Sequence, residues 1–475
     1  MRKSKGLTGL LLAGMAIMLV ACGSKAESKP ETLPEGSPAG EAAAGNRDGK
    51  DEKEDKGDTI ELTVMTNAVE GNLADFFDNR LPQLWAESHP DSRIVLKHEA
   101  MPFNDLQGAP LQVRYASGNA PDIQLMTVEM TLTLVEAGYL QELDEYYTDE
   151  VRADYFDGIV EGVSTFNHHQ YSFMLHRGLE LLAYDAAALE EAGIAPPKTP
   201  EDLIAAANAL NSSDRYAFTA FTDPVDHLIM TWMPFIWGQG GDALNETLDA
   251  GALDTPEVIK GLSLIRELAT SPAFNPMPSR PGNNGGILGD GETIFQFMPF
   301  GQCAMLQRDY ADRVEELGVT RYPTPEGMPF VTFGGGWALG ASAASKHPQE
   351  AKEVAYWMAI ESEAIVKEML ADSGNMPCRR SLLKDPEIAA IYEGKLYSMI
   401  MNDTEQLDGV RMAYVATSEF NKILIDLIDR TLFETNTPVE TIAREQNEKM
   451  NTYIAGYQGP KEGLSRRNMG LPADQ

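Results

Sequence analysis

Strand-like and helix-like patterns alternate in this sequence from Thr59 onward, and this alternation limits the possible folds more than any other feature. The segment TIELTVMTNAV alternates apolar and polar residues, as a half-buried strand does. A helical pattern, ADFFDNRLPQLWAESHP, and a second strand pattern, SRIVLKHEA, follow it. The next segment, PLQVRYASGNAPDIQLM, predicts a helix, a turn and a third strand. This β-α-β-α-β order predicts an α/β domain with a largely parallel sheet.

A later segment predicts how two helices leave a strand. The strand-like run Leu179–Tyr184 leads to Asp185, which can cap a short helix that ends at Gly193. Thr199 followed by Pro200 is a strong start signal for a second helix. The arrangement predicts that both helices have fixed directions relative to the strand.

The length predicts more than one core. Of the 475 residues, 417 follow the first 58, which is more than a single hydrophobic core usually organises. Strand and helix patterns continue along most of this length, so we expect two α/β lobes. Ligands of such proteins usually lie at strand carboxyl ends and between domains.

The first 58 residues predict export and a tether. Three basic residues precede an uncharged apolar run, Leu7–Val20, as in a signal peptide. The run is shorter than the roughly 20 residues that cross a membrane, and LVAC, ending at Cys22, resembles the bacterial lipobox. We expect residues 1–21 to be a lipoprotein signal peptide. Cys22 would then carry the lipid, such as palmitate, and residues 22–58, rich in Gly, Pro, Ser and charge, would be a disordered tether.

The charge excludes some partners. The formal net charge is −34, and removal of the three basic residues of the signal peptide makes it −37. Such a surface repels nucleic acid and anionic lipid, so we expect no nucleic-acid partner. The acidic solvated surface of an exported protein accounts for most of this charge.

The cysteines exclude a disulfide framework, because there are only three. The lipid would occupy Cys22, which leaves Cys303 and Cys378 as either a disulfide or two buried thiols. The sequence favours the thiols.

Motifs of catalysis are missing from the sequence. It contains no GxSxG, P-loop, GxGxxG between strand and helix, or HExxH. His168, His169 and His176 lie close together, as in a zinc carrier, but without paired cysteines nearby they are better explained as surface and turn histidines. The 72 acidic residues offer so many carboxylate pairs that no glycosidase pair can be chosen.

Aromatic residues near polar groups suggest sugar binding. Trp237, Tyr310 and Trp337 each lie in such a segment, and flat rings commonly cover the apolar face of a sugar. Trp232, within LIMTWMPF, is expected in the core, and core packing is also the alternative role for Trp237 and Trp337 when each is taken alone.

In order along the chain, these segments resemble the extracellular solute-binding proteins of bacterial ABC importers. This large carbohydrate-binding family includes the maltodextrin-binding proteins, and the resemblance covers nearly all of the chain beyond the tether. The matching segments, besides the lipobox, are ASGNAPDIQLM, EAGYLQELDEYY, LAYDAAALEEAGIAPPKTPEDLIAAANAL, LDTPEVIKGLSLIREL, FGQCAML, RYPTPEG, FGGGWALGASAASKHPQEAKEVAYWM and SGNMPCRRS.

The resemblance implies a two-lobe α/β fold of the periplasmic-binding-protein type (type II-like). Each lobe would be a sheet flanked by helices, with hinge crossings near residues 176–178, 325–330 and 375–378. The N-terminal lobe would hold residues 59–177 plus 328–376, and the C-terminal lobe residues 178–327 plus 377–475.

One departure concerns the ligand. The Gly-x-Trp that this family carries after "AM" is replaced by QRDY, so the ring beneath the sugar is either Tyr310 or absent. Arg177 and Arg308 would suit a carboxylated or phosphorylated sugar, although ion pairs with the abundant acids explain them equally well.

The candidate ligand residues come from several segments. Asn67, Glu70 and Glu129 lie at strand carboxyl ends of the first lobe. Arg308 and Tyr310 follow "AM", and Asp226 and His227 lead into the segment that carries Trp237. Trp337 follows a glycine run that leaves room for a ligand. The full set is Asn67, Glu70, Glu129, Arg177, Asp226, His227, Trp237, Arg308, Tyr310 and Trp337.

The resemblance implies a binding protein rather than an enzyme. It would be a monomer without cofactor or metal, anchored by lipid at the extracytoplasmic face of the cell membrane. There it would deliver a sugar or oligosaccharide to the membrane subunits of an ABC importer. Two alternatives stay open, an anchored glycan hydrolase and a binding protein for another solute or for a sensor.

Overall fold

The computed structural model describes residues 59–106, 109–156, 158–223, 226–277, 285–328, 330–401, 410–412, 418–459, 461 and 464. They belong to one compact unit, Lys56–Gln475. Cys22 and the predicted tether lie outside the described residues. Among the described residues, no helix combines the length and apolar character needed to cross a membrane.

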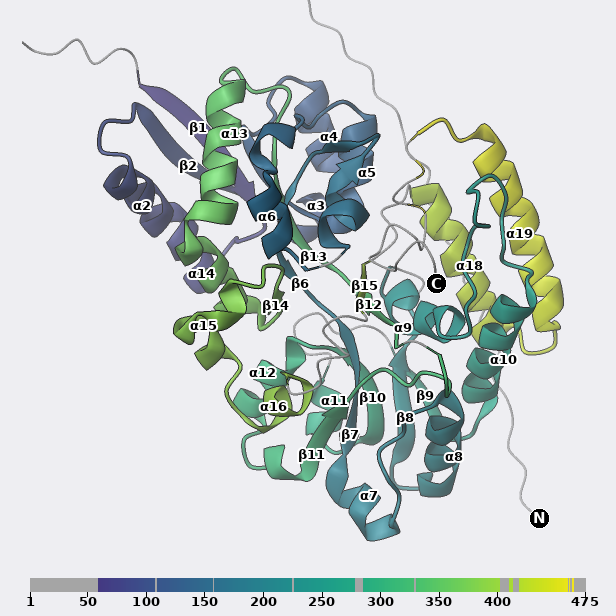
Figure 1. The fold of residues 1–475 in the computed structure, drawn as a ribbon. Helices are drawn as coiled ribbons and strands as arrows, with labels where there is room; N and C mark the ends of the chain where they lie inside the picture. The colour runs from purple at the N-terminus through teal and green to yellow at the C-terminus, as the bar shows by residue number, and fades with distance from the viewer. Residues whose placement is uncertain are drawn as a thin grey trace, which may run out of the picture. The chain divides into compact units, whose positions relative to one another are not determined.

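A six-stranded sheet, in the order β14-β6-β13-β3-β1-β2, organises the first part of the fold (Figure 1). β1 pairs in parallel with both β2 and β3. Helices α2, α5, α13 and α14 pack on its strands. The strands are β1 (Ile60–Thr66), β2 (Ile94–Ala100), β3 (Ile123–Thr127), β6 (Phe173–Arg177), β13 (Gly336–Ala341) and β14 (Met376–Pro377).

The helices of this part follow the predicted alternation. The predicted first helix is interrupted by a π-helical turn, η1, between α1 and α2. The helices and turns are α1 (Gly71–Asp75), η1 (Phe76–Arg80), α2 (Leu81–Ser88), α3 (Phe103–Leu106), α4 (Ala109–Ala116), α5 (Val128–Glu136), η2 (Asp144–Tyr146), α6 (Asp149–Asp154), η3 (Val160–Ser164), α13 (Pro348–Tyr356), η5 (Trp357–Glu361), α14 (Glu363–Ser373), η6 (Leu382–Lys384) and α15 (Pro386–Ile391).

A five-stranded sheet, in the order β11-β7-β10-β8-β9, organises the second part. Its strands are β7 (Glu180–Asp185), β8 (Tyr216–Phe221), β9 (Phe274–Met277), β10 (Thr293–Pro299) and β11 (Leu317–Thr320). The helices are α7 (Ala186–Ala192), α8 (Pro200–Leu210), α9 (Asp226–Trp237), α10 (Pro256–Thr270), α11 (Gly286–Gly289), α12 (Gln302–Asp309), η4 (Val314–Glu316) and α16 (Lys395–Met401).

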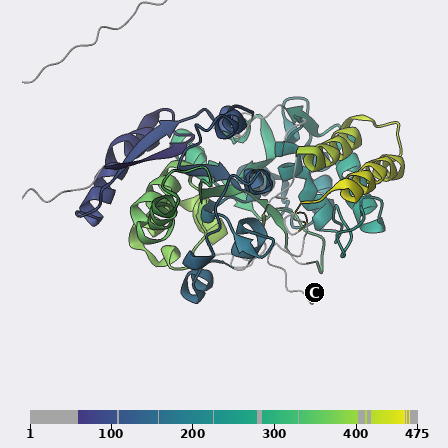
Figure 2. The same cartoon turned by 90° about the horizontal axis from the view of Figure 1, so that it is seen from above.

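Two smaller sheets and a pair of helices complete the described chain. β12 (Thr332–Gly334) pairs with β15 (Val410–Met412), and β4 (Thr165–Phe166) with β5 (His169–Gln170). The helices α18 (Ser418–Phe433) and α19 (Val439–Gly456) lie side by side and pack on α10 (Figure 2).

The expectation of a largely parallel sheet is wrong, because both large sheets are mixed. β13 runs antiparallel to β3 and to β6, and β7 runs antiparallel to β10 and to β11. The physical reason is the connectivity. β6 does not return through a crossover helix to its own sheet but continues directly into β7 of the other sheet, and β13 re-enters the first sheet from the opposite direction.

The predicted caps around α7 and α8 are confirmed. The Asp185 carboxylate accepts a hydrogen bond from the Ala188 backbone N–H, and α7 ends at Gly193 in a left-handed conformation with φ 68°. Thr199 and Asp202 form a capping box at the start of α8, where Pro200 occupies the first turn. These local interactions fix the directions in which both helices leave β7.

The chain passes between the two large sheets three times. Gly178 and Leu179 join β6 to β7, and the second passage runs from β11 to β13 by way of β12. The third begins after β14 and ends at α16, which packs on β11. The predicted lobe boundaries stay a prediction.

Candidate functional site

The carboxyl ends of β1, β2 and β3 meet at one edge of the six-stranded sheet. The Met101 N–H, just after β2, donates to the carbonyl of Thr66, the last residue of β1, at 2.9 Å. Asn67 follows at once and is half-buried, and Glu70 is exposed at the start of α1. Both predicted residues therefore lie in the loop at this edge.

Trp337 lies at the same edge. In β13 it is opposite Thr127, the last residue of β3, and a β-bulge between Trp337 and Ala338 interrupts the pairing with β6. Bulges of this kind redirect side chains next to binding sites. The half-buried Trp337 ring contacts Phe103 edge to face, with centroids 5.8 Å apart and planes at 62°, and Phe103 is 46% exposed. The edge therefore presents two aromatic rings to solvent.

Glycines let the backbone approach closely behind this aromatic pair. A β-carbon at Gly336 would collide with the carbonyl oxygen of His176 on β6. The Gly178 N–H donates to the Gly335 carbonyl at 2.9 Å, which joins the first passage to the second. The glycine run is thus required for strand packing at the point where the chain changes sheets.

Arg177 is buried rather than directed into an open cleft. It is 2% exposed, and its guanidinium carbon lies 4.2 Å from the centroid of the Phe156 ring, within the range of a cation–π interaction. Its position supports the interpretation of Arg177 as an internal structural cation in this conformation.

Two buried titratable groups flank the first passage. His176, in β6, is 1% exposed, and burial lowers its pKa to about 4, so the ring is neutral at pH 7. The expectation of a surface or turn histidine is therefore wrong for His176, because β6 lies inside the sheet. Glu180 begins β7, and burial raises its pKa to about 8. Its Oε2 atom has no hydrogen-bond partner among the described residues.

The predicted residues of the second part of the fold lie in different surroundings. Trp237, at the end of α9, is 1% exposed and stacks on Phe333 with centroids 6.2 Å apart. Trp232 is fully buried as predicted, and its indole N–H donates to the Phe221 carbonyl at 3.0 Å. A solute could reach Trp237 only if this packing opened.

Arg308 and Tyr310 lie at the end of α12. The Arg308 side chain is 72% exposed, and its guanidinium donates to both Asp309 carboxylate oxygens at 2.7 and 2.9 Å. The half-buried Tyr310 ring packs against Gly289, where a β-carbon would have no room. The ion pair with an acidic residue, which was the alternative to ligand binding for Arg308, is confirmed.

Three predicted positions can be placed only by their backbone. Glu129 is the second residue of α5, directly after the Thr127 edge, and Asp226 and His227 begin α9. Their side chains lie outside the described part of the structure.

Phe103 was missed by sequence analysis. Its signal was available, because it follows β2 by three residues and so comes after a strand carboxyl end, like the predicted Asn67.

One group of side chains has the composition of a metal site. Ligand atoms of Glu142, Asp144 and His169 lie within 4.8 Å of one another. The His169 ring already pairs with Asp144 through Nδ1 at 2.6 Å, which raises the histidine pKa. All three side chains are more than 40% exposed, as expected of surface ion pairs. His168 lies in the adjacent turn with φ 70°, as predicted for a turn histidine.

Cys303 and Cys378 are both buried free thiols, as predicted. Burial raises the pKa of Cys378 to about 12, so neither a reactive thiolate nor a metal ligand is favoured there.

The sequence of this chain is similar to those of known binding proteins. A probable ABC transporter-binding protein of Deinococcus radiodurans is 24% identical over 51% of this chain and 59% of its own length. The maltotriose-binding protein of Pyrococcus abyssi is 22% identical over 63% of this chain and 62% of its own length. The chain thus spans about three fifths of these curated relatives.

Solved structures share the fold at low sequence identity. The cyclic α-maltosyl-1,6-maltose binding protein of Arthrobacter globiformis has a TM-score of 0.70 and 19% identity, covering 84% of this chain and 100% of its own. The GacH receptor of Streptomyces glaucescens, solved unliganded and with acarbose, has a TM-score of 0.68 and 18% identity with the same coverage. These similarities support the two-lobe α/β fold.

The family model described as bacterial extracellular solute-binding protein matches residues 86–392, well over half of the chain. This range contains Trp337 and Phe103, every named strand of the two large sheets except β1, and the first two passages between the sheets. The chain belongs to the bacterial extracellular solute-binding protein family.

Proposed function

We propose that this protein binds a sugar or oligosaccharide and delivers it to the membrane subunits of an ABC importer. The observation that carries the sugar assignment is the Trp337–Phe103 pair, a half-buried ring and an exposed ring at the carboxyl-end edge of β1, β2 and β3. Such aromatic rings can cover the apolar face of a sugar ring, and the amide of Asn67 and the carboxylate of Glu70, in the loop at the same edge, can bind its hydroxyls. The names of the maltotriose- and maltosyl-maltose-binding relatives support the same class.

Delivery would use hinge closure. We propose lobes of residues 59–177 plus 328–376 and of residues 178–327 plus 377–475. The membership of β6 and β7 in different sheets supports a boundary near Gly178. A solute that contacts both lobes would shift the open–closed equilibrium toward the closed form.

The lobes would rotate as rigid bodies, with no change in secondary structure. Small-angle scattering should therefore show a smaller radius of gyration in the presence of a verified solute. An unchanged radius would contradict closure.

The proposal includes a lipid anchor at Cys22 on the extracytoplasmic face. The lipobox-like LVAC and the composition of residues 22–58 support it. Cys22→Ala should release the protein from membranes, since no helix among the described residues could span one. Unchanged membrane retention of this variant in cell fractionation would contradict the anchor.

A thermal-shift screen over mono- and oligosaccharides tests the sugar assignment. A ligand at a hundred times its dissociation constant stabilises the protein by roughly 2.7 kcal/mol, which raises the melting midpoint measurably. No shift with any sugar, together with a shift for another solute class, would overturn the assignment. Recovery of the bound glycan intact would separate binding from hydrolysis.

A further inference from the structure

The first and second passages between the large sheets are joined to each other where β7 begins. The Gly178 N–H donates to the Gly335 carbonyl at 2.9 Å. Two residues further on, the Glu180 carbonyl accepts a hydrogen bond from the Thr332 hydroxyl of β12 at 2.7 Å. Rotation of the proposed lobes about these passages would therefore act directly on the residues that begin β7.

The chain before the third passage reaches the same place. The side chain of Asn375, just before β14, lies 3.3 Å from the His176 ring, measured between Asn375 Nδ2 and His176 Nδ1. A β-carbon at Gly178 would lie 3.5 Å from Asn375 Oδ1, in ordinary contact. All the segments that connect the two large sheets thus meet around Gly178.

Glu180 is a buried acid at this junction. It is 3% exposed, and its Oε2 atom has no hydrogen-bond partner among the described residues. Pro299 lies opposite it in β10, and Tyr322 follows β11 by two residues. Burial and, to a smaller extent, the charge of Glu180 raise the pKa of the Tyr322 hydroxyl well above its usual value, so the two side chains lie close enough to interact.

The groups around Glu180 do not neutralise its charge. The strands β10, β11 and β12 and the helix α11 all contact β7, and none of them contains a titratable residue within its bounds. Glu180 forms no ion pair with a described residue, and burial raises its pKa from 4.5 to about 8. The titratable residues of β6, of the rest of β7 and of the start of the second passage are His176, Arg177, Tyr184, Asp185, Arg321 and Tyr322.

Loss of the Glu180 proton would place a carboxylate in a buried position with an oxygen that has no hydrogen-bond donor, which is unfavourable. The ionised acid is therefore more stable in a conformation that admits water to it. Gly178 can permit such a conformation, because glycine restricts the backbone least and this one precedes Glu180 by only two residues.

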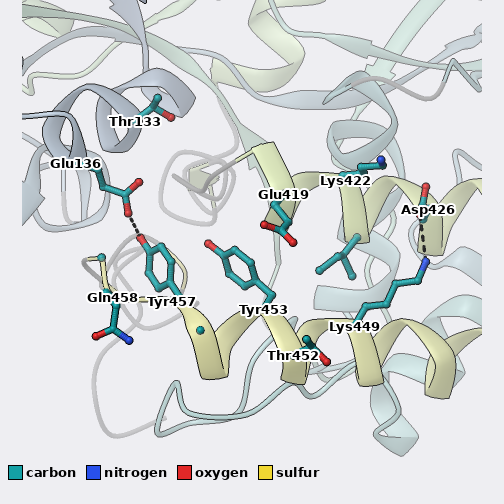
Figure 3. Close-up of a pocket in the computed structure, with 13 residues that line it drawn as sticks. Thr133, Glu136, Glu419, Lys422, Asp426, Lys449, Thr452, Tyr453, Tyr457 and Gln458 are labelled. Carbon is teal, nitrogen blue, oxygen red and sulfur yellow. Dashed lines mark hydrogen bonds and ion pairs between the residues drawn. The ribbon is translucent and has the colours of Figure 1, made fainter.

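A second contact between the proposed lobes lies away from the passages. The Tyr457 hydroxyl, just after α19, donates to Glu136 Oε1 at the end of α5 at 2.6 Å (Figure 3). α5 packs on β3 of the six-stranded sheet, and α19 packs on α10. A rotation of the lobes would alter this hydrogen bond, so the bond favours the orientation seen in this structure.

We propose that Glu180 acts as a pH-sensitive switch of the hinge. Its protonated form holds the lobes in the orientation described here, and its ionised form shifts them to an orientation in which water reaches the carboxylate. The inference rests on the hinge of the proposed function and adds regulation by pH to it. By linkage, a solute that favours one orientation also changes proton binding at Glu180.

The distance between the lobes, measured without solute at different pH values, tests the switch. Spin labels at Ala86→Cys of α2 and Ala205→Cys of α8 would report it by double electron–electron resonance, since both alanines are exposed. The Cys22→Ala variant serves as the background, because Cys303 and Cys378 are then the remaining native thiols and both are buried.

Between about pH 6 and about pH 9.5 the distance distribution of the labelled protein should change. The midpoint of the change should lie near the Glu180 pKa of about 8. Glu180→Gln should keep the low-pH distribution at every pH, because glutamine has nearly the same shape and no proton to lose in this range.

Tyr457→Phe provides a second variant, which removes only a hydroxyl group. Loss of its hydrogen bond makes the described orientation less favourable, so the midpoint should fall by up to about one pH unit. Glu326→Gln is the matched control, since Glu326 is an exposed acid of the second passage, and it should keep the unaltered midpoint. Circular dichroism would verify that all variants fold.

The outcomes separate the switch from the hinge. The same pH dependence with and without Glu180→Gln would overturn the switch, as would an unchanged distance over the whole pH range. If a solute verified by thermal shift still changes the distance, hinge closure stands and the switch alone fails. If neither pH nor such a solute changes it, the hinge of the proposed function fails as well. If Glu180→Gln does not fold, an unchanged midpoint in Tyr457→Phe overturns the switch.

Discussion

Two tryptophans predicted near the ligand lie in opposite surroundings. Trp237 is 1% exposed and stacks on Phe333, whereas Trp337 is half-buried and meets the exposed Phe103 edge to face. Both come from segments with glycines and polar residues nearby. The difference lies in the strands around them: Phe333 belongs to β12, which covers Trp237, while Trp337 follows three residues after β12 at the open edge of the larger sheet.

An aromatic side chain is accessible to a ligand where the strands around it end. The carboxyl ends of β1, β2 and β3 leave the Trp337 edge uncovered by further strand residues. The α9 end, by contrast, packs against β12. We therefore expect Trp237 to contribute to stability and Trp337 to binding.

The largest effect is expected from Trp237→Ala. Removal of a fully buried tryptophan leaves a cavity and should lower the free energy of unfolding by about 3–5 kcal/mol. Urea denaturation followed by circular dichroism measures it. A loss below about 1 kcal/mol with impaired sugar binding would reverse the assignment of the two tryptophans.

The next effect concerns the buried acid beside the Trp237 region. The Glu180 carbonyl accepts a hydrogen bond from Thr332, next to Phe333, and burial raises the pKa of the Glu180 carboxyl from 4.5 to about 8. Between these values the unfolded chain releases its proton first, so the contribution of Glu180 to stability falls as the pH rises from 4.5 to 8. Glu180→Gln should remove this decline, which lowers the free energy of unfolding by up to a few kcal/mol at pH 8.

His176, the buried histidine opposite Trp337, should make the protein more stable as the pH rises, which is the opposite of the effect of Glu180. Burial lowers the pKa of His176 from 6.5 to about 4. Its contribution is fully present above pH 6.5 and is lost as the pH falls toward 4. Chemical denaturation across pH 4–9 would separate the two groups, because Glu180→Gln should remove the decline in stability between pH 4.5 and 8 and leave the rise due to His176 between pH 4 and 6.5. If stability depends on pH in the same way in Glu180→Gln and in the wild type, the pKa of the Glu180 carboxyl is not raised in the folded protein.

The smallest effect is expected from Arg308→Ala. Its side chain is 72% exposed and paired with the adjacent Asp309, and such pairs contribute little to stability. The melting midpoint should stay unchanged, and neutral sugars should bind within about twofold of the wild type. A larger loss of affinity for a carboxylated or phosphorylated sugar, measured by calorimetry, would show instead that Arg308 reads an anionic ligand.

Local interactions made much of the fold predictable. The caps at Asp185 and Thr199 and the turn at Gly193 act over three or four residues, so their signals are contiguous in the sequence. The order of strands in the sheets was less accessible, because β13 joins β3 and β6 from more than 150 residues away. The expectation of a largely parallel sheet failed for that reason.

The site was predicted in part. Asn67 and Trp337 lie at the same sheet edge, since strand ends and glycine runs leave a signal in the sequence. The burial of Trp237 and Arg177 depends on rings contributed by distant segments, Phe333 and Phe156. The contact between Tyr457 and Glu136 of α5 was not predictable, because the two residues are more than 300 positions apart in the sequence.

The sugar is proposed to bind at the Trp337 edge. Titration calorimetry of the wild-type protein and Trp337→Ala, with the glycan found in the thermal-shift screen, tests it most directly. If the sugar lies against the Trp337 ring, this variant should lose a few kcal/mol of binding free energy, as for an aromatic anchor, and should still fold cooperatively. Affinity within about twofold of the wild type, a change well under 1 kcal/mol, would show that Trp337 is structural and that the sugar does not bind at this edge.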